Sequence, residues 1–285
     1  MDLNLNNITF IIVTYKSHKV IFNCLNSLPR NSNKIIIENS KDMNLKKDLE
    51  SKYDNIEVIL NENIGMGASN NIGIIKSKTK YAYIINPDVT FKSDTFEKLI
   101  KSTEVINDFA ILSPVNSNSN YPNFKNKITS KFDKEDIFEV DTVDGFSMLL
   151  NKEKFHNEDL FDENIFLYLE EIDLCKRLKK INKKIFMIES IKVEHFGGKS
   201  HNPIYSDLME FQRNWHYMWS LFYFSKKHHG IFFAYKNTLK KFFSAFFKCV
   251  FFYFFKKKKY LIYKHRFLGL LFSYLGKKSI FRVKL

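Results

Sequence analysis

The sequence predicts an α/β fold, in which a mixed, mostly parallel sheet is flanked by helices, followed by a basic, phenylalanine-rich helical region. Short apolar runs alternate with helix-like stretches through the first 115 residues, a pattern typical of strand–helix–strand units. Acidic residues end at Glu210, and residues 211–285 hold 17 of the 45 Lys and Arg residues and 16 of the 30 Phe residues. We therefore expect one domain over residues 1–210 and a second over residues 211–285.

Four apolar runs in the first half are expected to be buried strands, because continuous apolar residues are typical of parallel sheets covered on both faces. Helix candidates lie between them, as right-handed crossovers require. The strands are Ile8–Thr14, Lys34–Glu38, Ile56–Leu60 and Tyr81–Ile85, and the helices lie near His18–Ser27, Asn44–Tyr53 and Met66–Ser77. Ligands bind such sheets at the C-terminal ends of the strands, so the residues that follow each strand are the first candidates for a site.

The second half of the first domain is less regular. Asn116–Asn126 is expected to be a polar loop, Asp141–Leu150 a strand, Asn164–Lys180 a helix and Lys184–Ile188 the last strand. No internal repeat is visible.

The composition excludes several classes of protein. With 285 residues, 45% of them hydrophobic, and with 9 Gly and 5 Pro, the chain can bury a large core and is neither disordered nor fibrous. The cysteines Cys24, Cys175 and Cys249 are widely spaced, which argues against a disulfide framework or a cysteine zinc site and fits a reducing compartment. The first ten residues have no basic region and no cleavage site, so we expect no signal peptide and an intracellular protein.

Asn86-Pro87-Asp88 directly follows the fourth strand. A carboxylate at the mouth of a strand suits a hard divalent cation that bridges phosphate oxygens. The same three residues are also turn formers, and an ordinary turn is the alternative.

The segment Asn63–Gly73 follows the third strand and opens a helix. Its small residues, Gly65 among them, would let a ligand approach the backbone, and a helix N-terminus favours an anion. Asn63, Asn70 and Asn71 could donate hydrogen bonds to that ligand. A cap with close helix–sheet packing is the alternative, because glycine patterns are weakly specific.

The segment Phe161–Leu178 combines acidic and apolar residues at helical spacing. Glu171 shares a stripe with Leu167, Leu174 and Leu178, which predicts an inward-facing carboxylate. Burial raises the proton affinity of a carboxylate, a useful property in a general base. In the alternative interpretation, Asp173 pairs with Arg177 on the surface and Glu171 lies at the edge of the stripe.

His195 comes after the last predicted strand and before Gly197 and Gly198. A histidine in this setting can reach a metal or a diphosphate, although a structural or solvent-exposed histidine is the commoner case.

These segments, in this order, resemble the family-2 glycosyltransferases of the GT-A (Rossmann-like) fold. The resemblance is strongest to rhamnosyltransferase-like members that build bacterial surface polysaccharides such as O-antigen, and it covers roughly residues 8–230. It rests on VTYK at Val13–Lys16, Glu38-Asn39-Ser40, NIGMGASNNIG, Asn86-Pro87-Asp88 as a variant of the DxD metal motif, FDENIFLYLEEIDLCKRL, and the stretch that begins at His195.

The resemblance implies an inverting, metal-dependent hexosyltransferase that uses a nucleotide-sugar donor, with dTDP-L-rhamnose favoured and UDP-hexoses next. By position it implies that Asp88 binds Mg²⁺ or Mn²⁺ with help from His195, and that Glu171, flanked by Glu170 and Asp173, is the catalytic base. The implied nucleotide and donor residues are Thr14, Tyr15, Glu38, Asn63, Gly65, Asn70, Asn71, Asn86, Asp144 and Gly145.

Three residues depart from the pattern of the family. Lys16 replaces an Asn and Glu38 replaces an Asp, which bears on the selectivity for the nucleobase. Glu171 stands where Asp is usual and adds one methylene of reach.

The basic second domain predicts contact with a membrane surface. Its longest nearly apolar run, Phe242–Phe255, is shorter than the 18 to 20 or so residues that span a bilayer. Phe beside Lys, with no acidic residue, suits helices that lie on an anionic leaflet, on the inner face of the cell membrane near a lipid-linked saccharide acceptor. A buried core or the interface of a homo-oligomer is the alternative. Nucleic acid is disfavoured, because no recognition motif is present.

Overall fold

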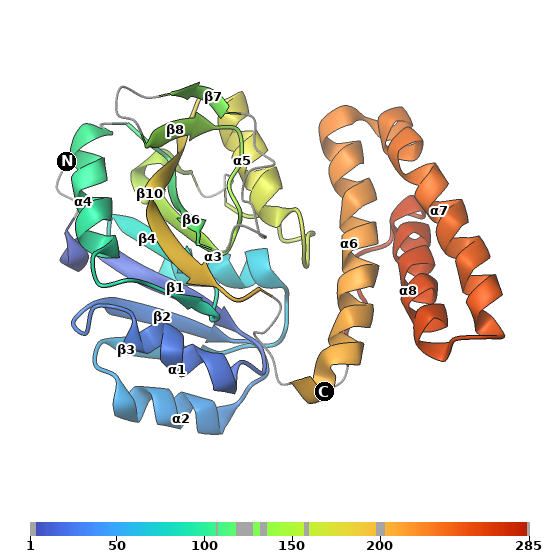
Figure 1. Ribbon diagram of the computed structural model, residues 1–285, viewed down its shortest axis with the longest axis horizontal. Helices are drawn as coiled ribbons and strands as arrows, with labels where there is room; N and C mark the ends of the chain where they lie inside the picture. The colour runs from blue at the N-terminus through green and yellow to red at the C-terminus, as the bar shows by residue number, and fades with distance from the viewer. Residues whose placement is uncertain are drawn as a thin grey trace. The chain divides into compact units, whose positions relative to one another are not determined.

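The computed structural model describes residues 4–106, 108–117, 128–131, 136–156, 160–197 and 203–283. The chain divides into two compact units (Figure 1). The first comprises Met1–Phe161 and Glu171–Asn202, and the second comprises Asp162–Glu170 and Pro203–Leu285. The predicted border at residue 210 thus falls inside the second unit, and a short segment from the middle of the chain joins that unit as well.

The described part of the first unit is built on a ten-stranded mixed sheet with the order β3-β2-β1-β4-β9-β6-β10-β8-β7, and β5 pairs with β10. The pairings make β1, β2, β3, β4, β6 and β10 run in one direction, with β9 antiparallel between β4 and β6. The strands are β1 Ile8–Thr14, β2 Asn33–Glu38, β3 Ile56–Leu60, β4 Tyr81–Ile85, β5 Val89–Thr90, β6 Ile111–Asn116, β7 Ile128–Lys131, β8 Ile137–Val140, β9 Ser147–Asn151 and β10 Ile185–His195.

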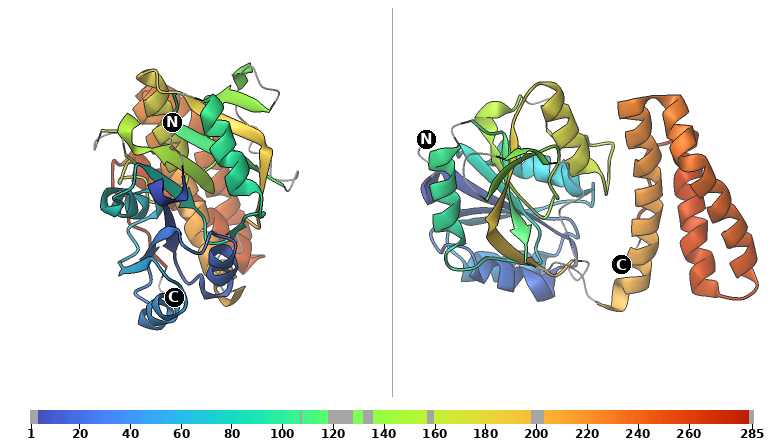
Figure 2. Two further views of the ribbon diagram at one scale, coloured as in Figure 1. Left: turned by 90° about the vertical axis from the view of Figure 1, so that its left-hand side faces the viewer. Right: turned by 45° about the horizontal axis from the view of Figure 1, so that its top comes forward.

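Helices cover both faces of this sheet (Figure 2). Alternate residues of β1 point to opposite faces, which is why the strand is apolar throughout. Phe10 and Ile12 join the core beneath α1 (His18–Asn26), α2 (Met43–Lys52) and α4 (Thr95–Val105). Ile11 joins the core beneath α3 (Met66–Lys76) and α5 (Glu170–Lys180). Short 3₁₀ turns lie at Leu5–Asn7, Lys152–Lys154 and Pro203–Tyr205. The predicted α/β architecture is confirmed.

Two predicted elements are wrong in extent. The helix expected from Asn164 begins at Glu170, because Tyr168 and Leu169 both have a φ of 71° and cannot continue a right-handed helix. The strand expected over Asp141–Leu150 begins at Ser147.

The last strand is longer than predicted and ends at His195 rather than before it. Of the predicted polar loop, Asn116 ends β6 and Ser117 is a bend, while residues 118–126 lie outside the described residues.

The described part of the second unit contains three α-helices, α6 (Ser206–His229), α7 (Ile231–Tyr253) and α8 (Lys257–Tyr274), and each packs against the other two. A small core forms around Met218, Phe222, Ala234 and Leu270. The segment Asp162–Glu170 belongs here because α6 holds it: Ser220 Oγ, for example, donates to the Leu167 carbonyl at 2.9 Å. Among the described residues, none of the helices has the length and apolar character needed to cross a membrane.

Candidate active site

Polar residues gather at one edge of the sheet, where the parallel strands end. Each of the first four strands is directly followed by a polar residue: Tyr15 after β1, Asn39 after β2, Asn61 after β3 and Asn86 after β4. His195 is the last residue of β10. Because these strands run in one direction, their carboxyl ends meet at a common edge, the usual ligand-binding edge of an open α/β sheet.

Asp88 is buried at this edge beside His195. The residue is 3% exposed, and neither carboxylate oxygen has a hydrogen-bond partner among the described residues. His195 Nε2 lies 3.4 Å from Asp88 Oδ1. The pairing of β5 with β10 sets this proximity, because it places Val89 opposite His195, and the Phe196 amide donates to the Asp88 carbonyl at 3.3 Å. The turn after β4 therefore carries a carboxylate that the protein leaves poorly satisfied.

Two neighbours orient His195. Its ring lies parallel to that of Phe146, with centroids 4.8 Å apart and planes 12° apart. Asn116 clamps its backbone, since Oδ1 accepts from the His195 amide at 3.3 Å and Nδ2 donates to the His195 carbonyl at 3.4 Å. The imidazole is thus held in place from its face and from its main chain.

Asp88 and His195 fit a divalent cation. A buried carboxylate without donors is costly unless a positive charge compensates it. Carboxylate oxygen and imidazole nitrogen are ligands that Mn²⁺ accepts, and Mg²⁺ is usually held by one or two carboxylates and by substrate phosphates. Within the described ranges no group of three or more His, Cys, Asp or Glu side chains could hold a metal. The pair would therefore need further ligands from a bound substrate or from water.

Glu171 lies over Gly145 at the start of α5. A Cβ placed on Gly145 would come within 3.4 to 3.9 Å of Glu171 Cβ, Cγ and Cδ. The Glu171 residue is half-buried. Burial, and then the negative charge of Asp144, raise the pKa of the Glu171 carboxyl to about 7. A carboxylate with this pKa accepts protons effectively near neutral pH.

Three consecutive residues, Asp144-Gly145-Phe146, connect Glu171 with the Asp88–His195 pair. Gly145 lies against the Glu171 side chain, the negative charge of Asp144 helps to raise the pKa of the Glu171 carboxyl, and Phe146 stacks on His195. The Phe146 carbonyl also accepts from the Asn86 amide at 2.9 Å, which ties the turn of Asp88 to the same segment. A proton acceptor and a candidate cation pair are therefore fixed to one short stretch of backbone.

At the ends of β1 and β2 the structure places Thr14, Tyr15 and Glu38 together. Thr14 is buried, with Oγ1 3.5 Å from the Ile37 carbonyl, and the Tyr15 amide donates to Ser17 Oγ. Glu38 is fully buried, and its carboxylate accepts from the Ser40 amide, the Ser40 hydroxyl and the Asp42 amide, the last at 2.6 Å. In this structure the Glu38 carboxylate therefore stabilises the loop that directly follows β2.

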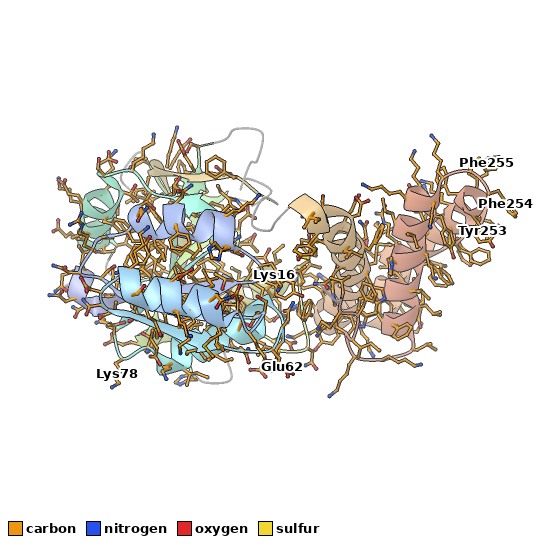
Figure 3. All side chains as sticks on the ribbon, turned by 90° about the horizontal axis from the view of Figure 1, so that it is seen from below. Lys16, Glu62, Lys78, Tyr253, Phe254 and Phe255 are labelled. Atoms are coloured by element: carbon orange, nitrogen blue, oxygen red, sulfur yellow. The ribbon has the colours of Figure 1, made fainter. Side chains whose placement is uncertain are left out.

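Lys16 follows β1 with a left-handed φ of 54°. It lies at the same end of the first unit as Glu62, which follows β3 (Figure 3). A cation at this edge of the sheet, where the resemblance to the family leads one to expect an asparagine, is a clear local difference from the family pattern.

The residues around the N-terminus of α3 that were predicted to contact a ligand have different surroundings. Gly65 precedes α3 with a φ of 107°, a conformation that favours glycine, and Asn63 lies before it, half-buried. Asn71 instead holds the chain, since it donates to the Phe161 carbonyl at 2.9 Å and accepts from the Phe161 amide at 3.0 Å. Asn70 is buried, and its Oδ1 has no partner among the described residues.

The acidic residues beside Glu171 are placed differently from it. Asp173 is fully buried and accepts from Arg177 Nε at 2.8 Å, while Arg177 also donates to the Leu160 carbonyl. This ion pair fastens α5 to the chain before it, and it is buried at Asp173 rather than on the surface. Glu170 is the first residue of α5 and is 7% exposed.

Comparison with known proteins decides the family. Residues 9–168, more than half of the chain, match the family model described as glycosyl transferase family 2. The chain belongs to this family. The rhamnosyltransferase WbbL of Escherichia coli (strain K12) is 26% identical over 222 residues, which cover 68% of this chain and 83% of that protein. The low-salt glycan biosynthesis hexosyltransferase Agl10 of Haloferax volcanii is 23% identical over 210 residues, 67% of each.

Solved structures support the GT-A fold of this family-2 glycosyltransferase. A crystal structure of GalNAc-T7 with UDP, GalNAc and Mn²⁺ matches with a TM-score of 0.53 at 13% identity, over 68% of this chain and 44% of that one, so less than half of its length is represented here. Staphylococcus aureus TarS, residues 1–349, matches with a TM-score of 0.52 at 12% identity, over 97% and 94% of the two chains. The family implies a nucleotide-sugar donor, a glycan acceptor and a role in glycan biosynthesis.

Sequence analysis missed Phe146 and Asn116 in this glycosyltransferase. The position of Phe146, directly after Asp144-Gly145, was the available signal. Asn116 ends β6, a strand that the apolar pattern did not reveal because Ser113 and Pro114 interrupt it.

Proposed function

We propose that the protein is an inverting glycosyltransferase that moves L-rhamnose from dTDP-L-rhamnose to a lipid-linked saccharide during synthesis of a cell-surface polysaccharide such as O-antigen. The observation that carries the proposal is the segment Asp144–Phe146, which joins Glu171 to Asp88 and His195. A base for the acceptor and a charge site for the donor diphosphate must be neighbours in a single-displacement reaction.

In this mechanism Glu171 removes the proton of an acceptor hydroxyl as that oxygen attacks the anomeric carbon. The bond between the anomeric carbon and the phosphate oxygen breaks on the opposite face, and the nucleoside diphosphate leaves with the electron pair. One displacement inverts the anomeric centre, so no second carboxylate nucleophile is needed. The raised pKa of Glu171 suits it to hold the proton after the transfer.

Asp88 and His195 would hold a divalent cation, Mg²⁺ or Mn²⁺. Such a cation would offset the negative charge of the diphosphate in the donor and in the leaving group. Asp88 is already buried beside His195, so neither residue would have to enter the site to contact such a cation.

The similarity to a rhamnosyltransferase favours dTDP-L-rhamnose, and the similarity to a hexosyltransferase supports UDP-hexose or UDP-galactofuranose as the alternative. Thr14, Tyr15 and Glu38 are proposed to face the nucleotide, with Lys16 as a residue that distinguishes this chain.

The second unit is proposed to hold the enzyme on the inner face of the cell membrane. It carries 17 basic residues and no acidic residue after Glu210, the composition of a surface attracted to anionic lipid. An acceptor anchored in that membrane would then reach the active site by diffusion in two dimensions.

Calorimetric titration of dTDP and UDP into the full chain, with Mg²⁺ and then with EDTA, tests the donor site. We expect cation-dependent binding of one nucleotide, abolished or strongly weakened by Asp88→Ala. If a folded sample binds neither nucleotide, the proposed function is wrong.

Glu171→Gln separates an enzyme from a non-catalytic protein that senses or binds a nucleotide sugar. The variant keeps the size of the side chain and removes the proton acceptor. We expect it to bind the nucleotide as tightly as wild type and to lose turnover in a panel of donors. Equal turnover in the variant and in wild type would remove Glu171 from the mechanism.

A further inference from the structure

Helix α7 is apolar on two opposite faces. Ala234, Thr238 and Ala245 are buried on the face by which it packs in the second unit, and Phe242 packs against the same core. Apolar residues also recur every three, four or seven positions along a second stripe. This stripe is displaced by two positions from the buried residues, as Phe232 is from Ala234, and therefore lies about 200° away from them around the helix axis. Its members, here called the outer stripe, are Phe232, Leu239, Phe243, Phe247 and Val250 of α7, together with Phe254, the residue that directly follows the helix and still has helical backbone angles.

All members of the outer stripe are exposed. Phe232 is 89% exposed and Phe254 is 73% exposed. Phe254 lies 22 positions after Phe232, so the stripe is about 33 Å long at 1.5 Å per residue. Soluble proteins rarely expose apolar surface of this extent unless a partner covers it. Since α7 already packs through its opposite face, folding of the second unit does not require the outer stripe.

The stripe ends in an aromatic tip. Tyr253, Phe254 and Phe255 project from the end of α7 (Figure 3). Tyr253 and Phe255 are 64% and 70% exposed. Lys256 to Lys259 follow immediately and are exposed as well. Apolar rings directly beside several cations are typical of segments that insert at the boundary between lipid headgroups and acyl chains.

The charges around the stripe favour an anionic partner over a second copy of the chain. Lys236 and Lys240 lie beside the outer stripe on α7 itself and are exposed, and residues 211–285 contain no acidic residue. Lys258 is already paired with Asp207 and Glu210, but its three neighbours have no ion-pair partner among the described residues. Two copies joined through their outer stripes would bring like charges together, whereas anionic headgroups would neutralise them.

We propose that the outer stripe of α7 lies parallel to an anionic bilayer surface, with its rings at the boundary of the acyl chains and its lysines among the headgroups. The inference rests on the proposed membrane association and adds to it the element and the face that make contact. A helix in this orientation needs no long uninterrupted apolar segment, and long lysine side chains can reach outward to the headgroups while their stems stay apolar.

Flotation of the full chain with vesicles tests the proposal. One set contains phosphatidylglycerol and phosphatidylcholine, and the other contains phosphatidylcholine alone. The variant Phe243→Ser/Phe247→Ser/Phe254→Ser changes exposed residues only, so the fold should survive, which circular dichroism checks. We expect wild type to bind the anionic vesicles and the variant to bind them at least roughly tenfold more weakly, because three apolar rings are lost from the lipid contact.

The matched control is Leu275→Ser/Ile280→Ser. Both residues are exposed apolar residues of the same unit, 59% and 61%, and lie outside the outer stripe. We expect this control to bind anionic vesicles within about twofold of wild type. Phe247→Trp should in addition show fluorescence quenching by brominated acyl chains beyond that of the parent protein, which contains Trp215 and Trp219.

The outcomes separate the two levels of the proposal. If wild type ignores anionic vesicles, both the outer-stripe contact and the membrane association are wrong, while nucleotide binding at the first unit stands on its own test. If the triple variant and wild type bind vesicles equally, the membrane association stands and the role of the outer stripe is overturned. That role is overturned as well if wild type is an oligomer that the triple variant dissociates without change in vesicle binding.

Discussion

The imidazole of His195 lies flat against the ring of Phe146, with centroids 4.8 Å apart and planes 12° apart. The carbonyl of Phe146 accepts the Asn86 amide at 2.9 Å, two residues before Asp88. One buried residue thus sets both the ring of His195 and the turn that carries Asp88. Because Phe146 has no polar side-chain atom, it would affect a cation at this pair only through the placement of His195 and Asp88.

Phe146→Leu should weaken cation-dependent nucleotide binding by roughly tenfold, since the imidazole loses the ring that fixes its orientation. The substitution keeps an apolar side chain of similar volume, so we expect a stability loss of about 1 kcal/mol. Calorimetry with Mn²⁺ and the preferred nucleotide measures the first effect, and urea unfolding measures the second.

Phe146→Tyr keeps the stacking ring and serves as the control for Phe146→Leu. It should restore most of the binding if the added hydroxyl is accommodated. Cation-dependent binding that is unchanged in Phe146→Leu would show that the stack is structural only.

Asp144→Asn should move the pH dependence of turnover. In wild type we expect kcat to rise with pH through a midpoint near 7, because Glu171 must be deprotonated and burial raises its pKa to about 7. Asp144 adds to this rise through its negative charge. Removal of that charge favours ionised Glu171, so the midpoint should fall to a lower pH.

The control for Asp144→Asn is Asp141→Asn, a change of the same kind three residues away on the same segment. We expect it to leave the midpoint where wild type has it. A midpoint in Asp144→Asn that stays the same or rises would contradict the proposed coupling of Asp144 to Glu171.

Much of the fold could be predicted because its central strands, β1 and β4 among them, are buried on both faces. Continuous apolar runs located β1, β3 and β4 with their observed bounds, and β2 to within one residue. The start of α5 could not be predicted, since the left-handed φ values of Tyr168 and Leu169 are typical of neither residue type. Tertiary contacts to α6 hold this segment, and such contacts leave no periodic signal in the sequence.

The location of a candidate site residue was predictable where it follows from the residue's position at the end of a strand. Asp88 and His195 end or follow parallel strands, and the structure brings them to 3.4 Å. The catalytic and binding roles assigned to the individual residues remain predictions. The engagement of the Glu38 carboxylate by Ser40 and Asp42 was not predictable, because the conformation of the loop, not its composition, directs those amides.

Gly269→Ala should destabilise the second unit. A Cβ at this position would lie 2.3 Å from the Trp215 carbonyl oxygen, so α8 and α6 would have to separate. Overpacking of this kind costs about 1 to 3 kcal/mol, although Ala favours a helix over Gly by about 1 kcal/mol. We expect a lower urea midpoint, measured by circular dichroism, and unchanged nucleotide binding under native conditions.

Lys240→Ala is the control for Gly269→Ala, since it introduces the same residue at an exposed position in a helix of the same unit. Its urea midpoint should match that of wild type. A midpoint for Gly269→Ala at or above that of the control would mean that α8 has room to shift.

His216 should make the stability of the second unit depend on pH. The ring is fully buried, with Nε2 2.8 Å from the Phe281 carbonyl and Nδ1 2.8 Å from Ser279 Oγ. Because a carbonyl can only accept, Nε2 carries the proton and Nδ1 accepts from the serine, so the neutral ring is fully satisfied. Burial lowers the pKa of His216 from 6.5 to about 3, and the bond to Phe281 opposes that change.

The sign of the pH effect follows from this lowered pKa. Between about pH 6.5 and pH 3, His216 is protonated in the unfolded chain but neutral in the folded chain. The free energy of unfolding therefore falls as the pH falls, by up to about 1.4 kcal/mol per pH unit. His265, whose pKa burial lowers to about 4, adds a second contribution of the same sign. The variant His216→Gln should keep only the contribution of His265. Its free energy of unfolding, measured with urea at pH 7, 6 and 5, should therefore depend less steeply on pH than that of wild type. A slope equal to that of wild type would mean that His216 binds its proton in the folded state.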